Sequence, residues 1–371
     1  MRAILISIAV VALAAGGPGA QTRAAKTLDI YVIDAEGGKA TLFVSPSGES
    51  ALIDSGNPGT RDVDRIMAVL SEAGIKRIDY LISTHYHVDH IGGMTELAGR
   101  VPIAHYVDHG PSVEAREQVQ GFQQAYADLH SKAKHIVVKP GDKLPIGALE
   151  WRIVTAGGKT IKSPLPGGGK PNPFCAQFKP RDKQNDTDEN WHSVGSVISF
   201  GNFRTIDLGD LLWNNEFDLM CPNNPIGPVD LYLTSHHGID ASGSATLVHA
   251  LQPRVAITQN GTRKGATLQT SGIINSSPGF DDLWQLHWSY NGGVEHNPAG
   301  LFVANVDEAE TIAAVLTTPP QAGGGGGGSG GGRGGPPHTG AAHWIKVSAH
   351  TDGSFIVTNS RNGFSKTYVR R

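Results

Sequence analysis

The chain has 371 residues, of which 39% are hydrophobic and 18% are charged, and its formal net charge is −3. This composition is typical of a globular protein that buries a substantial core. The overall charge excludes strong electrostatic capture of nucleic acid or of an anionic membrane, so we expect no stable complex with nucleic acid.

The N-terminus has the three-part layout of a secretory signal. Arg2 precedes an apolar run at residues 3–15, and small residues follow. The run is short and is broken by Gly-Gly-Pro at residues 16–18, which favours export over a transmembrane anchor. We therefore expect residues 1–24 to be a signal peptide and the mature protein to be periplasmic or extracellular, without a membrane anchor.

Short strands and one helix follow the signal. Apolar and β-branched runs bounded by turn residues predict strands, and apolar residues at helical spacing before Gly74 predict a helix. The expected strands are residues 28–34, 39–45, 50–54 and 78–83, and the expected helix is 60–74.

The middle of the chain continues this alternation around one long loop at residues 157–190, which is rich in glycine and proline. Further strands are expected at residues 135–139, 149–154, 193–200, 203–208, 229–235 and 254–258. Helices are expected at residues 111–133, 211–219, 243–251 and 280–287.

A low-complexity segment precedes the C-terminal piece. Residues 321–337 are mostly glycine, which has no side chain to pack, and we expect them to be flexible. Residues 338–371 have the pattern of a three-stranded meander with turns at TDG and RNG. Because this piece is small, we expect its strands to pair with the main sheet.

The segment STHYHVDHIGG, residues 83–93, places three histidines and an aspartate directly after an apolar strand. Residues two apart in an extended segment point to the same side, so His85 and His87 can bind one cation. Asp89 and His90 follow as the chain turns, where they can face a second cation. Such groups around two adjacent cations are typical of sites that activate a hydroxide, and the alternative is a turn with surface histidines.

The same segment resembles the metal-binding signature of the metallo-β-lactamase superfamily. GDLL, whose aspartate is Asp210, is similar to the family's metal-bridging Gly-Asp segment. LYLTSHHGIDASGS is similar to the family's late histidine motif, in which the ligand is His237 or His236, with a slight preference for His237 beside Gly238. The resemblance implies an α+β fold, a four-layer αββα sandwich, over a hydrolase domain at residues 26–320.

The third ligand of the first cation has two interpretations. WHSVGSVISF is similar to the superfamily's His-Thr-Pro-Gly-Ser segment, which makes His192 a ligand. The runs VIDAEGGKATLFVSPSGESALIDSG, NWHS and SHHG more closely resemble the metallohydrolase domain of ComEC-like competence proteins, where an Asn-x-x-Ser run stands here. In that alignment Asn190 and Ser193 are the family positions. We favour His192 as a ligand because imidazole binds zinc well.

Asp54 ends an apolar strand, where the superfamily places an acidic residue beneath the metals. The resemblance implies that Asp54 orients a ligand histidine through a hydrogen bond. The alternative is that Asp54 only starts the turn before Gly56 and Pro58, and the sequence supports both equally.

The chain has two cysteines, Cys175 and Cys221. In an oxidising compartment they can form one disulfide, and the alternative is two free buried thiols. Basic residues gather in the loop at 157–190 and in NGTRKGA at 260–266, where they either hold an anionic substrate or are simply solvated.

The resemblance implies two divalent cations, with Zn²⁺ the first expectation and Mn²⁺ the alternative. Asp210 and Asp89 are the expected catalytic residues, the first bridging the cations and the second orienting a metal-bridged hydroxide. The ComEC-like resemblance favours a phosphodiester in a nucleic acid or nucleotide as substrate. The alternatives are a hydrolase of a cyclic amide or ester, such as a β-lactam or lactone, and a non-catalytic metal-binding module.

Overall fold

A computed structural model describes residues 26–114, 117–291, 296–306 and 341–371. The expected signal peptide at residues 1–24 and the glycine-rich segment at 321–337 lie outside the described residues. Within the described part, no helix is both long and apolar enough to cross a membrane.

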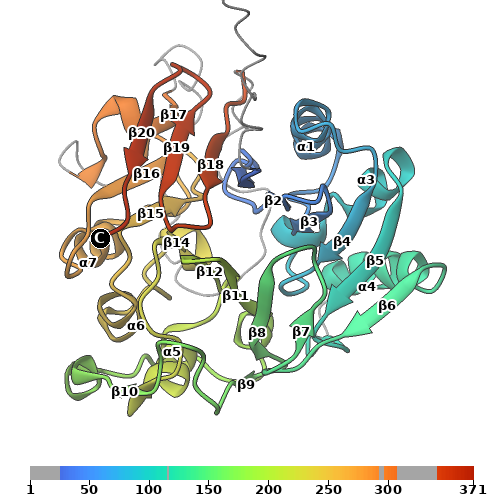
Figure 1. Ribbon diagram of the computed structural model, residues 1–371. Coiled ribbons are helices and arrows are strands. Elements are labelled where there is room, and N and C mark those ends of the chain that lie inside the picture. The colour runs from blue at the N-terminus through green and yellow to red at the C-terminus, as the bar shows by residue number, and fades with distance from the viewer. Residues whose placement is uncertain (1–25, 115–116, 292–295, 307–340) are drawn as a thin grey trace, which may run out of the picture.

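Two nine-stranded sheets form the centre of the molecule (Figure 1). The first sheet has the order β20-β19-β18-β1-β2-β3-β4-β5-β6. Its strands are β1 (Leu28–Val32), β2 (Thr41–Val44), β3 (Ser50–Ile53), β4 (Ile78–Ile82), β5 (Ile103–Asp108), β6 (Lys134–Val137), β18 (Ile345–Ala349), β19 (Phe355–Asn359) and β20 (Ser365–Tyr368).

The second sheet has the order β17-β16-β15-β14-β12-β11-β8-β7, and β9 pairs with β8 beside this path. Its strands are β7 (Lys143–Leu144), β8 (Glu150–Ala156), β9 (Lys159–Thr160), β11 (Gly195–Phe200), β12 (Phe203–Asp207), β14 (Leu231–Leu233), β15 (Val255–Thr258), β16 (Asp282–His287) and β17 (Val303–Asn305). A separate two-stranded sheet joins β10 (Lys170–Pro171) to β13 (Asn223–Asn224).

Helices cover the outer faces of both sheets. The helices near the first sheet are α1 (Thr60–Glu72), α2 (Val88–Ile91), α3 (Met94–Arg100) and α4 (Glu117–His130), and those near the second are α5 (Trp213–Met220), α6 (Ala245–Leu251) and α7 (Leu268–Asn275). Short 3₁₀ helices are η1 (Pro173–Gln177), η2 (Glu189–His192), η3 (Ser235–Gly238) and η5 (Gly300–Phe302).

Three buried clusters correspond to the three spaces between these layers. In β1, Leu28, Ile30 and Val32 join the core between the sheets, whereas Tyr31 joins the outer core under the helices of the first sheet. A third cluster lies between the second sheet and α5–α7. The four-layer αββα sandwich expected from the resemblance is therefore confirmed, because both faces of each sheet are buried.

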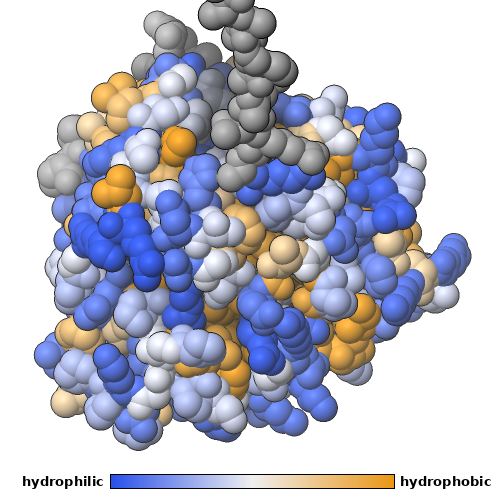
Figure 2. Space-filling model, in the orientation of Figure 1, coloured by the Kyte–Doolittle hydropathy of each residue, from blue (hydrophilic) through white to orange (hydrophobic). Residues whose placement is uncertain are grey.

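The surface in the same orientation is mostly hydrophilic with scattered hydrophobic patches (Figure 2). This distribution is expected where the apolar residues fill three internal layers.

The C-terminal strands extend the first sheet beyond β1. β18 pairs antiparallel with β1, and Ile345, Val347 and Ala349 point into the core between the sheets. Lys346 and Ser348 alternate with them and are partly exposed, as the period of a half-buried strand requires.

The expected helix at residues 280–287 is wrong, because Asp282–His287 forms β16. This strand lies between β15 and β17 in parallel pairing, and five of its six residues are buried. An interior parallel strand shows no alternation of apolar and polar residues, so its period resembled that of a buried helix segment.

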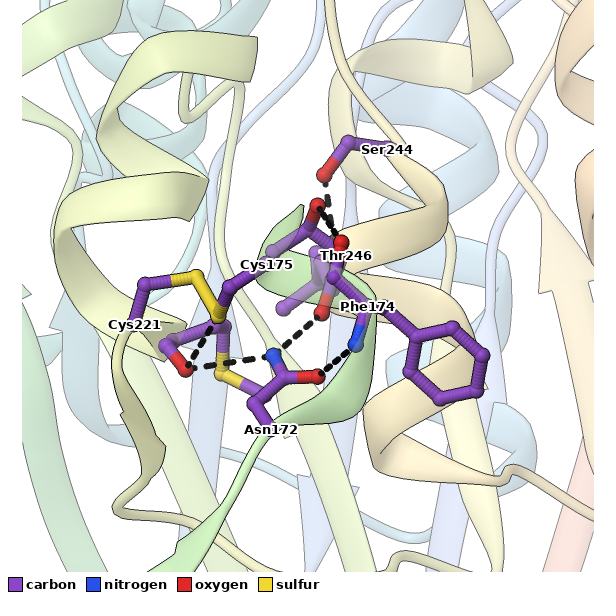
Figure 3. Close-up of a disulfide and its surroundings, with 8 residues drawn as sticks. Asn172, Phe174, Cys175, Cys221, Ser244 and Thr246 are labelled. Atoms are coloured by element: carbon purple, nitrogen blue, oxygen red, sulfur yellow. Dashed lines mark hydrogen bonds between the residues drawn. A yellow bond between two sulfur atoms is a disulfide. The ribbon is translucent and has the colours of Figure 1, made fainter. Parts of the chain in front are cut away.

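A disulfide joins Cys175, in η1, to Cys221, directly after α5 (Figure 3). Beside it, Nδ2 of Asn172 donates hydrogen bonds to the carbonyls of Met220 at 3.1 Å and Thr246 at 3.0 Å. These contacts attach the long loop at 157–190 to α5 and α6, so the loop has a defined path despite its lack of sequence periodicity.

Candidate metal centre

The histidine-rich segment begins where β4 ends at Ile82. The chain stays extended through His87, whose ψ of 148° precedes the first residue of α2. His85 and His87 therefore lie on one side of the segment, and Nε2 of His85 is 3.0 Å from Nδ1 of His87. The helix then turns Asp89 and His90 inward, and both are buried.

Four side chains from three segments converge on one point, and we call them the Asp–His cluster: Asp89, His90, Asp210 and His237. Nε2 of His90 is 3.2 Å from Oδ2 of Asp210 and 3.3 Å from Nε2 of His237. Nε2 of His237 is 3.3 Å from Oδ2 of Asp89 and 3.4 Å from Oδ2 of Asp210. Ligands held tetrahedrally at about 2.0 Å from Zn²⁺ are about 3.3 Å apart, so the spacing of these donors fits a divalent cation.

The charges within the Asp–His cluster also favour a cation. The pKa of His90 is raised to about 10, because burial, which lowers it, is outweighed by the carboxylates of Asp210, Asp54 and Asp89. Burial would raise the pKa of Asp210, but His90 and its histidine neighbours hold it well below its usual range. Oδ1 of Asp210 is buried and has no hydrogen-bond partner among the described residues, as expected for an oxygen that serves a metal.

Asp54 supports this centre from beneath. Its Oδ2 accepts hydrogen bonds from Nδ1 of His90 at 2.7 Å and from the hydroxyl of Thr84 at 2.8 Å. Its Oδ1 accepts from the backbone N–H of Thr84 at 2.8 Å. Asp54 therefore fixes the orientation of the His90 ring and leaves Nε2 directed at the Asp–His cluster.

A strained turn presents the two late histidines. His236 and His237 have φ of 53° and 55°, a left-handed conformation that is rarely adopted by two consecutive non-glycine residues. The carbonyl of Gly209 accepts from the N–H of His236 at 3.0 Å, which holds the turn. A Cβ at Gly265, whose φ is 80°, would lie 1.9 Å from the carbonyl oxygen of His237, so only glycine fits there.

The adjacent residues His237 and His236 have different contacts. His237 belongs to the Asp–His cluster, and its Nδ1 donates to the carbonyl of Gln259 at 3.1 Å. Nδ1 of His236 is 3.0 Å from the hydroxyl of Ser242, and its Nε2 lies 3.4 Å from Oδ2 of Asp210. Burial lowers the pKa of His236 to about 3, so this imidazole is neutral beside Asp210.

His85 and His87 lie beside the Asp–His cluster, but the expected third ligand His192 does not join them. Burial and the neighbouring histidines hold the pKa of His85 well below its usual range. Nε2 of His87 contacts Oε1 of Glu114 at 2.9 Å, and Asp188 lies close to both. Nε2 of His192 instead donates to the carbonyl of Asp186 at 2.9 Å, because η2 turns this ring toward the preceding loop.

Asn190 and Ser193, the family positions in the ComEC-like alignment, are both fully buried. The hydroxyl of Ser193 accepts from the N–H of Asp210 at 3.2 Å and so positions the segment that carries this carboxylate. Both polar atoms of the Asn190 side chain have no hydrogen-bond partner within the described part of the chain.

Two lysines bond carboxylates near the centre, and of the two Lys264 lies in the basic run expected from sequence either to hold an anionic substrate or to be solvated. Nζ of Lys39 is buried and bonds Oδ1 of Asp207 at 2.6 Å, and the same oxygen accepts from the N–H of Gly209 at 2.9 Å. Nζ of Lys264 bonds Oδ2 of Asp89. The basic run NGTRKGA was the signal for Lys264, whereas nothing local in EGGK indicates a buried ion pair.

One family model matches part of the chain. Residues 33–178 match the family model described as the metallo-beta-lactamase superfamily, a range that includes the histidine-rich segment and ends before Asp210.

Three curated proteins match shorter segments. A coenzyme F420H2 oxidase of Methanothermobacter marburgensis is 36% identical over 99 residues, which cover 26% of this chain and 23% of that protein. A probable metallo-hydrolase of Burkholderia pseudomallei is 31% identical over 131 residues, 32% of this chain and 43% of that protein. A hydroxyacylglutathione hydrolase of Idiomarina loihiensis is 26% identical over 90 residues, 24% of this chain and 28% of that protein. The chain thus spans less than half the length of each.

Proposed function

We propose, from its metallo-β-lactamase superfamily domain and its buried Asp–His cluster, that this protein is a metal-dependent hydrolase that cleaves a phosphodiester. The observation that carries the proposal is the convergence of two carboxylates and two imidazoles at the spacing that a divalent cation requires. A bound divalent cation supplies a nucleophile at neutral pH by lowering the pKa of water, and it polarises the substrate oxygen.

The residues of the chain have distinct tasks in this proposal. Asp89, His90, Asp210 and His237 hold the cation. Asp54 orients His90, and the hydroxyl of Ser193 positions the backbone of Asp210. We include a second cation in the proposal, because His85 and His87 offer nitrogen donors for it beside the Asp–His cluster. Zn²⁺ is the first candidate for both, with Mn²⁺ as the alternative.

An anionic substrate is supported by Lys264. Its side chain is 43% exposed, yet its Nζ reaches Oδ2 of Asp89 inside the cluster. The lysine therefore stands between the cluster and solvent, where its charge can attract a phosphate oxygen. The resemblance of VIDAEGGKATLFVSPSGESALIDSG to ComEC-like metallohydrolase domains favours the same substrate class.

Hydrolysis of a cyclic amide or ester is the second candidate function. It is supported by the similarity to a protein named as a hydroxyacylglutathione hydrolase, which is 26% identical over 90 residues. The secretory-signal layout of residues 1–24 leads us to propose export, and a periplasmic location suits a β-lactam or lactone as well as a phosphodiester.

One assay series tests the proposal. The protein without residues 1–24 is purified, its bound metal is measured, and bis-p-nitrophenyl phosphate, a chromogenic cephalosporin and a homoserine lactone are assayed in parallel. We expect turnover of the phosphodiester that Asp210→Ala abolishes. Turnover of the lactone or the cephalosporin alone would select the second function. Metal-loaded protein without turnover of any of the three would contradict both.

A further inference from the structure

Three side chains outside the candidate metal centre converge on the outer face of the first sheet, and we call them the Asp108 cluster: Asp108, His130 and His135. One potential metal-ligating atom from each lies within 4.8 Å of the other two. Asp108 ends β5, His130 ends α4 and His135 lies in β6, so each side chain comes from a different element (Figure 1).

The strand register explains why Asp108 and His135 share a face. β5 and β6 are parallel, with Tyr106 paired to His135. Side chains two residues apart on a strand point the same way, so Tyr106, Asp108 and His135 all face the same side. Tyr106 belongs to the outer core beneath the helices. α4 packs on this side and delivers His130 at its last residue, only five positions before His135.

Asp108 is held rigidly for a ligand role. Its carboxylate is fully buried, its Oδ1 accepts from the N–H of Gly110 at 2.8 Å, and its Oδ2 accepts from the hydroxyl of Tyr126 at 2.6 Å. Nε2 of His135 donates to the same Oδ2 at 2.7 Å. Metal ligands that are fixed by such neighbours bind more tightly, because less motion is lost on binding.

The two histidines are open to solvent on the other side. Their rings stack with centroids 3.8 Å apart, and the His135 side chain is 28% exposed. Both rings line a cavity of about 620 Å³, together with Tyr86, Tyr126 and Gln123. A cation could therefore enter from solvent, and coordination positions not filled by protein would face this cavity.

We propose that Asp108, His130 and His135 form a second, separate binding site for a divalent transition-metal ion. Two imidazoles and one carboxylate are the donor set that zinc and its neighbours in the first transition row bind through three protein ligands. Oxygen-preferring Mg²⁺ and Ca²⁺ are disfavoured by two nitrogen donors. The site is distinct from the Asp–His cluster, with which it shares no residue.

Binding requires a small change in the present contacts. Nε2 of His135 gives up the hydrogen bond to Asp108, its proton moves to Nδ1 of the same ring, and the freed lone pair binds the cation. The 2.7 Å contact then lengthens to the spacing of about 3.3 Å between two ligands of one Zn²⁺ ion. The bound ion would connect the edge strand β6 to the end of α4, and so stabilise this side of the sheet.

The test separates this site from the proposed catalytic centre. The Asp210→Ala/His237→Ala protein lacks two ligands of the Asp–His cluster, and His130→Gln and His135→Gln are added to it. Each protein is loaded with Zn²⁺, dialysed and analysed for metal, and Co²⁺ spectra report the donor set. We expect the protein that also carries both glutamines to bind one equivalent of Zn²⁺ fewer than the Asp210→Ala/His237→Ala protein, because any ion held by His85 and His87 is common to both. Equal metal content in the two proteins would overturn the proposal.

A second measurement covers the case in which the Asp210→Ala/His237→Ala protein does not fold. His130→Gln/His135→Gln is then made in the otherwise unchanged protein, and His350→Gln, in the β18–β19 turn, is the matched control. We expect the double variant alone to bind one equivalent of Zn²⁺ fewer and to lose part of the Zn²⁺-dependent rise in Tm, with turnover of the substrate within about twofold of the control. Unchanged stoichiometry in the double variant would again overturn the site.

Discussion

Oδ2 of Asp54 and Nδ1 of His90 are 2.7 Å apart, and both groups are fully buried. Because the carboxylate orients the ring, we expect Asp54→Asn to weaken metal binding by about 10- to 100-fold while keeping the fold. Asparagine suits this position because Asp54 has φ of 60°, a conformation that asparagine tolerates. Competition with a chromogenic chelator measures the affinity. Asp64→Asn, an exposed acid on α1, is the control, and equal affinities would refute the role.

The two adjacent histidines of η3 can be separated by metal analysis. Nε2 of His237 lies 3.3 Å from Oδ2 of Asp89 and 3.4 Å from Oδ2 of Asp210, at the centre of the Asp–His cluster. His237→Ala should therefore lower metal affinity by 100-fold or more, about 3 kcal/mol. Nε2 of His236 lies 3.4 Å from Oδ2 of Asp210, and Ser242 holds the other side of the ring, so His236→Ala should have a smaller effect on metal content. Metal analysis after dialysis at low free Zn²⁺ compares the two, and the reverse order would assign the ligand to His236.

Much of the candidate metal centre could be predicted from local sequence. Four candidate ligands lie within the six residues 85–90 after one strand, and the Gly-Asp and His-His-Gly runs mark the positions of Asp210 and His237. The expected support of a ligand histidine by Asp54 corresponds to an observed hydrogen bond. Each of these signals is short, because the candidate ligands follow directly after strands that are apolar and easily recognised.

Contacts between distant segments could not be predicted in the same way. Lys264 meets Asp89 across 175 positions, and only the closed sandwich brings them together. Glu114 reaches His87 from the loop before α4, where no local pattern identifies a site residue. β16 was expected to be helical because its burial depends on neighbours on both sides rather than on its own alternation.

Gly265 is expected to be essential for the position of His237. Gly265→Ala places a methyl group against the carbonyl of His237 and also forces alanine into φ of 80°. We expect loss of metal binding together with a destabilisation of at least about 1 kcal/mol. Gly272→Ala in α7 is the matched control, since its Cβ would meet nothing within 4 Å. Calorimetry and metal analysis of both variants test this, and a Gly265→Ala protein that binds metal normally would contradict the packing argument.

The Cys175–Cys221 disulfide should contribute substantially to stability. It closes a loop with a sequence separation of 46, for which the chain-entropy relation gives about 4 kcal/mol. Cys175→Ser/Cys221→Ser should therefore unfold at lower denaturant concentration than the oxidised protein, without a change in metal content. Reduction of the unsubstituted protein should reproduce the shift. Coincident unfolding curves for the oxidised protein and the double variant would show that the crosslink contributes nothing.

Glu216 should make the stability of the fold depend on pH. Its two carboxylate oxygens accept from the N–H groups of Gly243 and Ser244, each at 2.7 Å, but burial raises its pKa to about 7. Between the pKa of about 4.5 in the unfolded chain and about 7 in the folded protein, the folded state holds the extra proton. The free energy of unfolding therefore falls as pH rises through this window, by at most about 1.4 kcal/mol per pH unit.

Glu216→Gln removes this titration and leaves a side chain of the same shape. The loss of one acceptor for a backbone N–H destabilises the variant by an amount that does not depend on pH. The stability advantage of the unsubstituted protein should therefore shrink from pH 4.5 to pH 7 and stay constant above it. Urea unfolding of both proteins at several pH values, with metal removed by chelator, isolates this difference because other titrating groups are common to both. A difference that is constant across the window would mean that Glu216 is ionised in the folded protein, and that its two backbone donors outweigh its burial.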